Sequence, residues 1–341
     1  MKYFISNRYD GCWYYRCYLP MYYNGFSGDK ESWGADKDRA KDSALVLKAD
    51  TVIFQRPDEE SKLHAAVLLQ RAGKKIVFEN DDTYKDDNPM KLKGVENRSD
   101  ILDAFVRMAD MVTTTTEFLA DEYRKLNKNV VVLKNCIDPR DWPHKVVNDT
   151  DKVRIGIFGS ATLNGDCEPI LRLLESFKNR DDIQLVIFGL PDKTASKEIK
   201  ELYKDDIKFW DNLDVEWHPF SSMKDYFKTL ASLKLDIALV PRKDNYFNRC
   251  KSNLKFLEAS MLEIPVVAQG FNDGLSPYQG ADDKDFMFIA KTDEDWSVMT
   301  ERLIQDKDFR VILGQEAKKY VLKNYNIKDN FKNWAEAYKK I

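Results

Sequence analysis

The chain has 341 residues, of which 43% are hydrophobic and 33% are charged, and its formal net charge is -3. This length is natural for two domains of ordinary size, and the composition excludes a disordered chain. The net charge excludes a protein that coats nucleic acid by bulk charge, although a local basic groove remains compatible with it.

The N-terminal part alternates short apolar runs with longer segments of helical period. Strands are expected at 2–6, 51–55, 75–78, 111–115 and 130–133. Helices are expected at about 37–49, 59–72, 99–109 and 116–126, and Gly73 is predicted to end the second of them as a C-cap. Runs that are apolar throughout are typical of parallel strands covered on both faces, so this part is predicted to be a doubly wound α/β domain.

An unusually aromatic segment, 8–26, follows the first expected strand. One interpretation is that its tyrosines and tryptophan pack into the domain core. The other is that the segment is a loop in which arginines and glycines are interleaved with rings that stack on a sugar or a nucleobase. The second interpretation makes the segment a candidate ligand-binding loop.

The segment 138–152 contains two prolines and several aspartates, and it is predicted to be an interdomain linker. A second series of strands follows, at 154–158, 183–188, 207–210, 215–218, 237–240, 265–268 and 286–289. Helices are expected at 166–179, 195–203, 223–234, 253–263, 293–305, 308–323 and 328–340.

The alternation predicts two Rossmann-like doubly wound domains that face a central cleft. We expect the first domain at 1–146, the second at 147–325, and an aromatic C-terminal helix at 326–341 that packs back on the first domain.

The most informative stretch is 236–268, which reads as strand, polar loop, helix and strand. Ligands of open α/β sheets bind outside the carboxyl ends of the strands, where this loop is expected to lie. Ser252 is a candidate N-cap for the helix, and Lys251 and Asn253 flank it. A helix N-terminus offers unpaired backbone N–H groups and partial positive charge, which suit a diphosphate.

Lys251, Lys255 and Glu258 are spaced so that they fall on one face of a helix. Lys255 and Glu258 have two interpretations: an exposed ion pair, or a buried carboxylate that accepts hydrogen bonds from two ribose hydroxyls. The apolar neighbours Phe256 and Leu257 favour burial, and a buried carboxylate needs a specific partner.

These residues carry a resemblance to a known family. The pattern of Pro241, Asp244, Phe247, Asn248, Lys251, Ser252, Lys255, Glu258 and 265–268 resembles the donor-site segment of GT-B glycosyltransferases of family 4 (glycosyl transferases group 1). Other matching pieces are Asp10-Gly11, Gln55-Arg56-Pro57, Asp81-Asp82, 109–117, 135–138 and 156–160, in the order expected for that family. The short chain also resembles small virus-type members. Cys250 stands where the family often has a first glutamate, so the sugar and the stereochemical outcome stay open.

The resemblance implies a retaining transferase with a nucleotide-sugar donor and a hydroxyl acceptor. The implied donor-binding residues are Gly159, Ser160, Asp244, Asn248, Lys251, Ser252, Asn253, Lys255 and Glu258. The expected acceptor-binding residues are Gly11, Tyr14, Tyr15, Arg16, Arg56 and Asp81. The expected catalytic residues are Lys251 and Lys255, which stabilise the leaving diphosphate, and Asp10 and Asp82, which are candidate bases.

No obligatory cofactor or metal is expected. Asp81 and Asp82 are adjacent but do not form a clean DxD pattern, so we interpret them as acidic residues that line the cleft; a divalent-ion site and a solvated loop are the alternatives. The five scattered cysteines, the polar N-terminus and the lack of a long apolar run predict a soluble, cytoplasmic chain.

The acceptor class stays open at this stage. A soluble or surface glycan is the first expectation, and DNA that carries 5-hydroxymethylcytosine is the second, because the aromatic segment offers rings for a flipped base. A sugar-nucleotide epimerase or a non-catalytic sugar-nucleotide-binding protein of the same architecture is the rival class. The sequence says nothing about the oligomeric state.

Overall fold

The computed structural model describes residues 1–6, 10–29, 39–84, 99–159, 165–190, 196–280 and 283–341. The chain divides into two compact units. The first comprises Met1–Asp138, Cys250–Ser252 and Tyr325–Ile341, and the second comprises Pro139–Arg249 and Asn253–Asn324.

The first unit is built on a six-stranded sheet in the order β2-β1-β3-β4-β5-β6, in which every pair of neighbours is parallel. Its strands are β1 (Lys2–Ser6), β2 (Ser27–Gly28), β3 (Thr51–Gln55), β4 (Lys75–Glu79), β5 (Met111–Thr114) and β6 (Val130–Val132). All residues of β3 and β5 are buried, as expected for strands covered on both faces.

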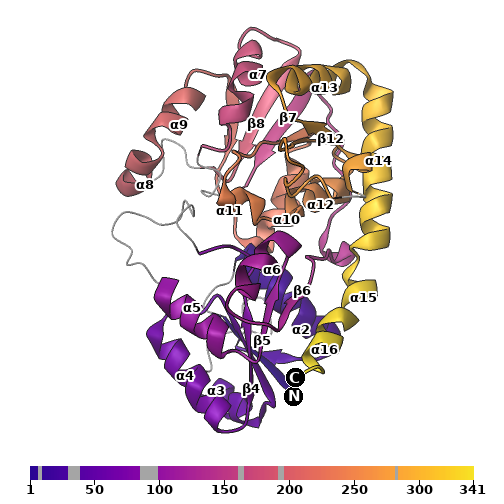
Figure 1. The fold of residues 1–341 in the computed structure, drawn as a ribbon. Coiled ribbons are helices and arrows are strands. Elements are labelled where there is room, and N and C mark those ends of the chain that lie inside the picture. Colours follow the sequence, from indigo (N-terminus) through magenta and orange to yellow (C-terminus); the bar gives the residue numbers. More distant parts are fainter. Residues whose placement is uncertain (7–9, 30–38, 85–98, 160–164, 191–195, 281–282) are drawn as a thin grey trace. The chain divides into compact units, whose positions relative to one another are not determined.

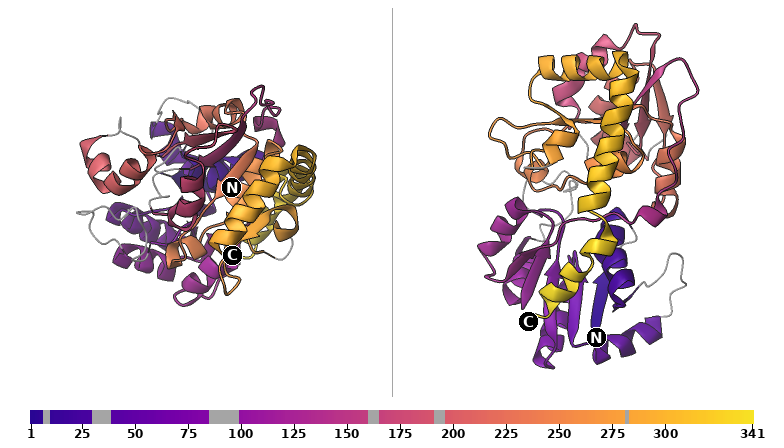
Figure 2. Two further views of the ribbon diagram at one scale, coloured as in Figure 1. Left: turned by 90° about the horizontal axis from the view of Figure 1, so that it is seen from above. Right: turned by 90° about the vertical axis from the view of Figure 1, so that its right-hand side faces the viewer.

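Helices cover this sheet (Figure 1). They are α1 (Gly11–Trp13), a π-helix (Tyr14–Tyr18), α2 (Leu19–Asn24), α3 (Arg39–Lys48), α4 (Glu60–Arg71), α5 (Ser99–Met108), α6 (Glu117–Arg124), α15 (Ile327–Asn330) and α16 (Lys332–Tyr338). α4 packs beside α5, and both α15 and α16 pack on α2, so that the two termini of the chain lie in this unit (Figure 2). Gly73, with a φ of 82°, follows the C-cap residue Ala72 of α4, which confirms the expected helix end.

The second unit has a six-stranded parallel sheet in the order β12-β11-β10-β7-β8-β9. Its strands are β7 (Val153–Phe158), β8 (Ile183–Phe188), β9 (Val215–His218), β10 (Ile237–Val240), β11 (Val266–Gln269) and β12 (Phe288–Ala290). From β7, the strands β8 and β9 follow towards one edge of the sheet, and β10, β11 and β12 follow towards the other edge. This is the strand order of a Rossmann domain.

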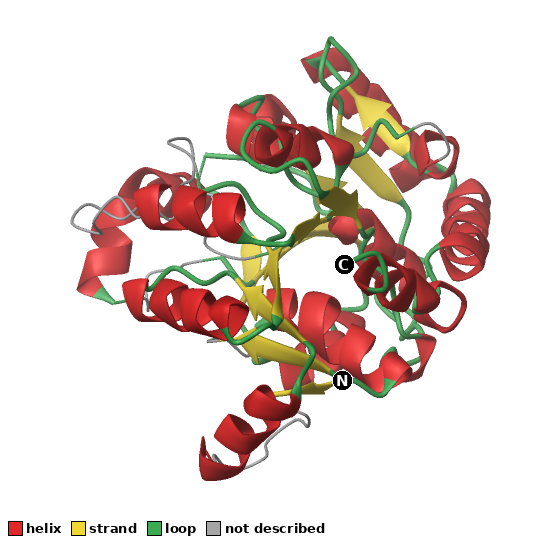
Figure 3. Cartoon of the chain, turned by 60° about the horizontal axis from the view of Figure 1, so that its bottom comes forward, coloured by secondary structure: helices red, strands yellow, loops and turns green. Residues whose placement is uncertain are grey.

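Helices flank this sheet as well (Figure 3). They are α7 (Leu171–Ser176), α8 (Lys197–Leu202), α9 (Lys204–Trp210), α10 (Met223–Ser232), α11 (Tyr246–Arg249), α12 (Leu254–Met261), α13 (Asp293–Gln305) and α14 (Lys307–Asn324). The core of the unit joins side chains of β7 and β8 to α7 and α13, including Ile155, Leu185, Leu174 and Trp296.

Two expectations from the sequence are wrong. The run 207–210, expected to be a strand, lies in α9. Ile207 and Trp210 are three residues apart, which places both buried side chains on one helical face, and Trp210 joins the core of the second unit. Of the two interpretations of the aromatic segment, the one that makes it a loop is also wrong, because the segment is helical from Gly11 to Asn24.

Candidate functional site

The reversal of strand order in the second unit lies between β7 and β10. In open α/β sheets, the carboxyl ends of the strands at such a reversal form the ligand crevice, because the connecting loops diverge there. The carboxyl ends of β7 and β8 continue into Gly159 and Gly189. The Gly159 N–H donates to the carbonyl of Phe188, and the Gly189 N–H donates to the carbonyl of His218, both at 3.0 Å.

The two glycine loops approach each other closely. Gly189 has a φ of 83°, and a Cβ atom at this position would lie 2.3 Å from the Gly159 carbonyl oxygen. Only glycine fits such a contact without backbone movement. The predicted donor residue Gly159 therefore lies in a tightly packed turn, whereas the predicted residue Ser160 lies outside the described residues.

The helix that carries the predicted donor residues begins one residue later than expected. α12 runs from Leu254 to Met261 with Asn253 at the N-cap, and the Asn253 side chain donates to Asp283 at 2.5 Å rather than capping the helix. Ser252 is therefore not the N-cap. Lys251 precedes the helix, so the expectation that it shares a helical face with Lys255 and Glu258 is wrong.

A triad of side chains, two buried and one partly buried, lies on α12 and α10. Glu258 is only 3% exposed, and its Oε2 atom accepts hydrogen bonds from Lys255 Nζ at 2.7 Å and from the Tyr226 hydroxyl at 2.8 Å. Lys255 Nζ also donates to the Tyr226 hydroxyl at 3.0 Å and lies 5.0 Å from the centre of the Phe158 ring. Burial and the Glu258 carboxylate raise the pKa of Tyr226 well above its usual value, so the phenol keeps its proton. Glu258 is thus buried and Lys255 partly buried, and the two share a third partner rather than form an exposed ion pair.

A second buried polar cluster lies at the carboxyl end of β10. Asp166 accepts from Arg242 at 2.8 Å, from the Asn248 side chain at 2.6 Å and from the backbone N–H of Lys243 at 3.1 Å. Arg242 and Asp166 are almost fully buried. The cluster joins the chain that follows β7 to the loop that follows β10, which are the two strands at the reversal. Asn248 is a predicted donor residue, and in the structure it holds this junction together.

The predicted donor residue Asp244 lies at the surface. Both of its carboxylate oxygens accept from Arg249, at 2.6 and 2.9 Å, and Arg249 also pairs with Asp273 at 2.6 Å. This network lies at the C-terminal end of α11, whose last residue is Arg249. A pair of this kind contributes about 0.2–1 kcal/mol to stability.

The segment Cys250–Ser252 belongs to the first unit, and each of its residues makes a polar contact there. Lys251 Nζ donates to Asp82 at 2.5 Å, the Ser252 hydroxyl accepts from the Asn135 side chain at 2.9 Å, and the Cys250 carbonyl accepts from Thr116 at 3.3 Å.

Three predicted residues of the first unit lie together beyond the carboxyl ends of β3 and β4. Arg56 donates to Asp81 at 2.7 Å and forms a second ion pair with Asp82. Burial acts to raise the pKa of Asp81, but Arg56 and the Cys12 thiol outweigh it, so the pKa of this carboxyl lies below its usual value. Arg56 has a φ of 46°, an uncommon backbone conformation for a residue with a side chain. Asp81 and Asp82 are thus charge-paired carboxylates.

Asp10 and Gly11 begin α1. Asp10 is the N-cap residue, and its carboxylate accepts from the backbone N–H of Trp13 at 3.0 Å. This contact explains why an aspartate precedes the glycine, since a helix N-terminus favours a negative oxygen acceptor.

The other predicted acceptor residues lie in the core of the first unit. Tyr14, Tyr15 and Arg16 are at most 2% exposed. Arg16 donates to both oxygens of Glu79, at 2.8 and 3.1 Å, and lies over the ring of Trp334. The core interpretation of the aromatic segment therefore holds for these three residues, because the helix turns them towards the sheet.

Among the described residues, no group of three or more His, Cys, Asp and Glu side chains is arranged to hold a metal ion. Likewise, none of the helices within those ranges is both long enough and apolar enough to cross a membrane. None of the five cysteines forms a disulfide.

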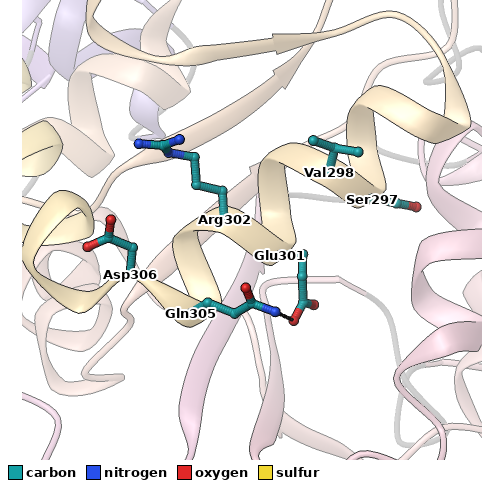
Figure 4. Close-up of a pocket in the computed structure, with 6 residues that line it drawn as sticks. All are labelled: Ser297, Val298, Glu301, Arg302, Gln305 and Asp306. Atoms are coloured by element: carbon teal, nitrogen blue, oxygen red, sulfur yellow. Dashed lines mark hydrogen bonds between the residues drawn. The ribbon is translucent and has the colours of Figure 1, made fainter.

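A pocket on the surface of α13 contains none of the predicted site residues (Figure 4). It is lined by Ser297, Val298, Glu301, Arg302, Gln305 and Asp306. These residues lie along one helix and its C-cap, and Gln305 donates at 2.8 Å to Glu301, one turn earlier on the helix.

Tyr226, Asp166 and Arg242 are site residues that the sequence does not single out. Tyr226 lies 32 residues before Glu258, on a helix whose apolar stripe makes it look like an ordinary core residue. Arg242 directly follows Pro241 in the motif, and this position is the feature of the sequence that could have marked Arg242 as a site residue.

The whole chain is similar in fold to solved structures of other proteins. HepE of Anabaena, solved with UDP and glucose, superposes with a TM-score of 0.68 at 11% identity over 100% of this chain and 99% of that one. A sucrose-phosphate synthase of Thermosynechococcus elongatus gives a TM-score of 0.67 at 11% identity, over 99% of this chain and 98% of that one. TarM gives 0.62 at 12% identity over 86% of this chain, which matches only 57% of TarM.

These likenesses show the GT-B fold, with its two parallel sheets each flanked by helices. No protein-family profile matches the sequence, and neither does any curated protein.

Proposed function

We propose that this chain is a glycosyltransferase that moves a sugar from a nucleoside-diphosphate sugar to a hydroxyl group of an acceptor. The observation that carries the proposal is the buried Glu258 carboxylate, which accepts hydrogen bonds from Lys255 and Tyr226. It lies in the unit of the GT-B fold whose sheet has the strand order of a Rossmann domain. HepE, which has the same fold, has been solved with UDP-glucose. The second unit would bind the donor and the first unit the acceptor.

In this proposal each donor residue has one task. Glu258 accepts hydrogen bonds from the ribose hydroxyls, because a buried carboxylate suits a vicinal diol. Lys255 binds the diphosphate, and the lack of a side chain at Gly159 lets a phosphate approach the backbone there. Lys251 and Ser252, which the resemblance also implies as diphosphate ligands, belong to the first unit. Asn253, Asp244 and Asn248 shape the loop around α12, as their contacts with Asp283, Arg249 and Asp166 indicate.

The reaction forms a bond between the acceptor oxygen and the anomeric carbon and breaks the bond from that carbon to the diphosphate. The acceptor proton goes to the leaving phosphate in a retaining, front-face reaction, or to Asp10 or Asp82 as a base. Lys255 stabilises the charge that develops on the diphosphate, which is the largest catalytic contribution expected. Lys251, which the resemblance implies for the same task, is paired with Asp82 in the first unit. No obligatory metal takes part.

The first unit supplies the acceptor residues Gly11, Arg56 and Asp81, which lie at the carboxyl edge of its sheet or follow it. We favour a glycan as acceptor. Tyr14 and Tyr15, the two rings expected to bind the acceptor, are buried and offer no surface to a flipped base, whereas Tyr22 of the same segment is exposed. The reduced cysteines support a cytoplasmic location.

Calorimetric titration with UDP, ADP and GDP tests the donor site. At least one nucleotide should bind, and Glu258→Ala should raise its Kd about tenfold or more, since a hydrogen bond to a charged group is worth about 1.5–3 kcal/mol. Glu301→Ala removes a partly exposed glutamate on α13 of the same unit, which pairs with Arg180; it is the matched control and should leave the Kd unchanged. An unchanged Kd in a folded Glu258→Ala protein would refute the assignment.

A further inference from the structure

Tyr226 has a specific relation to the proposed ribose carboxylate. It lies on α10, and its hydroxyl donates to Glu258 Oε2, the same oxygen that accepts from Lys255. Two protein donors therefore converge on one carboxylate oxygen. The last side-chain torsion of glutamate has a broad energy profile, so it is contacts of this kind that fix the plane of the carboxylate.

The surroundings of Tyr226 hold its ring in place. The ring stacks on Phe188, the last residue of β8, with 5.5 Å between the ring centres and 23° between the planes. Phe227 meets it edge-on, and Tyr226 as a whole is 7% exposed. The hydroxyl is thus aimed at Glu258 by packing that does not depend on any ligand.

We propose that Tyr226 is a positioning residue: it fixes the orientation of the Glu258 carboxylate and thereby sets how strongly the site prefers a ribonucleotide over its 2′-deoxy counterpart. This inference rests on the proposed function, in which Glu258 accepts from the ribose hydroxyls. A carboxylate held in one orientation loses less freedom when the diol binds, so its discrimination against a missing hydroxyl is greater.

The test compares Tyr226→Phe with the wild type for the tightest binder among UDP, ADP and GDP and for its 2′-deoxy form. Tyr226→Phe keeps the ring stack and removes only the hydroxyl. The Kd of the ribonucleotide should rise about three- to tenfold, or about 0.6–1.4 kcal/mol, which is the range of a typical net hydrogen bond, while the Kd of the deoxy form changes less than about twofold. Tyr203→Phe removes the hydroxyl of another buried tyrosine of the same unit and should change neither Kd.

A merely structural role for Tyr226 predicts that both Kd values rise together, and that result, or no change in either, would overturn the inference. If Tyr226→Phe does not fold, Phe188→Leu serves instead, because it loosens the ring but keeps the hydroxyl. It should lower the preference in the same direction, and an unchanged preference would count against the inference.

Glu258→Gln separates this inference from the proposed function. If it abolishes the ribose preference while Tyr226→Phe leaves the preference intact, only the role of Tyr226 is refuted. If Glu258→Gln keeps the preference, or if the wild type binds none of the three nucleotides, the proposed role of Glu258 fails and the inference fails with it. In the Glu258→Gln background, Tyr226→Phe should have no further effect on the preference.

Discussion

Gly189→Ala provides a sharp test of the packing at the carboxyl ends of β7 and β8. The new Cβ would lie 2.3 Å from the Gly159 carbonyl oxygen, and the residue would keep a φ of 83°. The backbone strain costs about 1–2 kcal/mol, and the overpacking adds about 1–3 kcal/mol. We therefore expect a loss of about 3 kcal/mol in the free energy of unfolding.

Gly274→Ala is the matched control, since Gly274 lies in the same unit with a φ of 80°, and a Cβ atom added there would have no other atom within 4 Å. It carries the backbone strain without the clash, so it should cost only about 1–2 kcal/mol. Urea unfolding followed by tryptophan fluorescence measures both variants, and Trp210 and Trp296 report on the core of the second unit. Equal losses in the two variants would refute the close approach of the two glycine loops. Because that approach shapes the Gly159 turn, Gly189→Ala should also weaken nucleotide binding, whereas Gly274→Ala should not.

Three further predictions follow from particular contacts. Glu263 has a φ of 55° and pairs with Lys318 at 2.9 Å. Glu263→Gly relieves backbone strain of about 1 kcal/mol and should stabilise the chain slightly in thermal or urea unfolding. Glu263→Gln keeps the strain but loses the ion pair, so it should destabilise the chain by about 0.5 kcal/mol. Hydrogen bonds from Arg154 outweigh burial and lower the pKa of Glu216 to about 2. The contribution of Glu216 to stability is therefore present above the usual glutamate pKa and is lost as the pH falls towards 2. In this window the free energy of unfolding should depend less steeply on pH in Glu216→Gln than in the wild type, and an identical dependence would contradict this. Prior treatment with EDTA should leave the Kd for the nucleotide unchanged, and a Kd restored only by added divalent ion would show that a metal takes part.

The sequence predicts the architecture well because the strands of both sheets are short apolar runs. The runs at 51–55 and 183–188 become buried strands with the expected ends, and the fold class is confirmed. The run at 207–210 misleads because Ile207 and Trp210 satisfy a helical spacing within a stretch too short to reveal its period.

The candidate site is predicted only in part. The KSxxKxxE pattern brings Lys255 and Glu258 together because both are on one helix, and a local spacing is enough for that. The partners Tyr226 and Asp166 come from distant segments and could not be inferred from spacing. The aromatic segment misleads for another reason: its tyrosines read equally well as a binding loop or as a core helix, and the sequence does not give their direction.

The ion pair of Lys251 with Asp82 could not be predicted from the sequence either, since 169 residues separate the two positions. Local spacing suggested that Lys251 shares a helical face with Lys255. The backbone instead starts its helix at Leu254, and Lys251 turns to a carboxylate of the first unit.

The measurement that tests the central claim most directly is incubation of the chain with a mixture of labelled sugar nucleotides and either cell glycan extract or hydroxymethylcytosine DNA. We predict that the label enters the glycan fraction and that Glu258→Ala reduces the rate at least about tenfold, in line with its effect on binding. Label in the DNA alone would overturn the choice of acceptor. A free epimer or free sugar formed without any need for an acceptor, or no conversion of any sugar nucleotide, would contradict the claim that the chain is a glycosyltransferase.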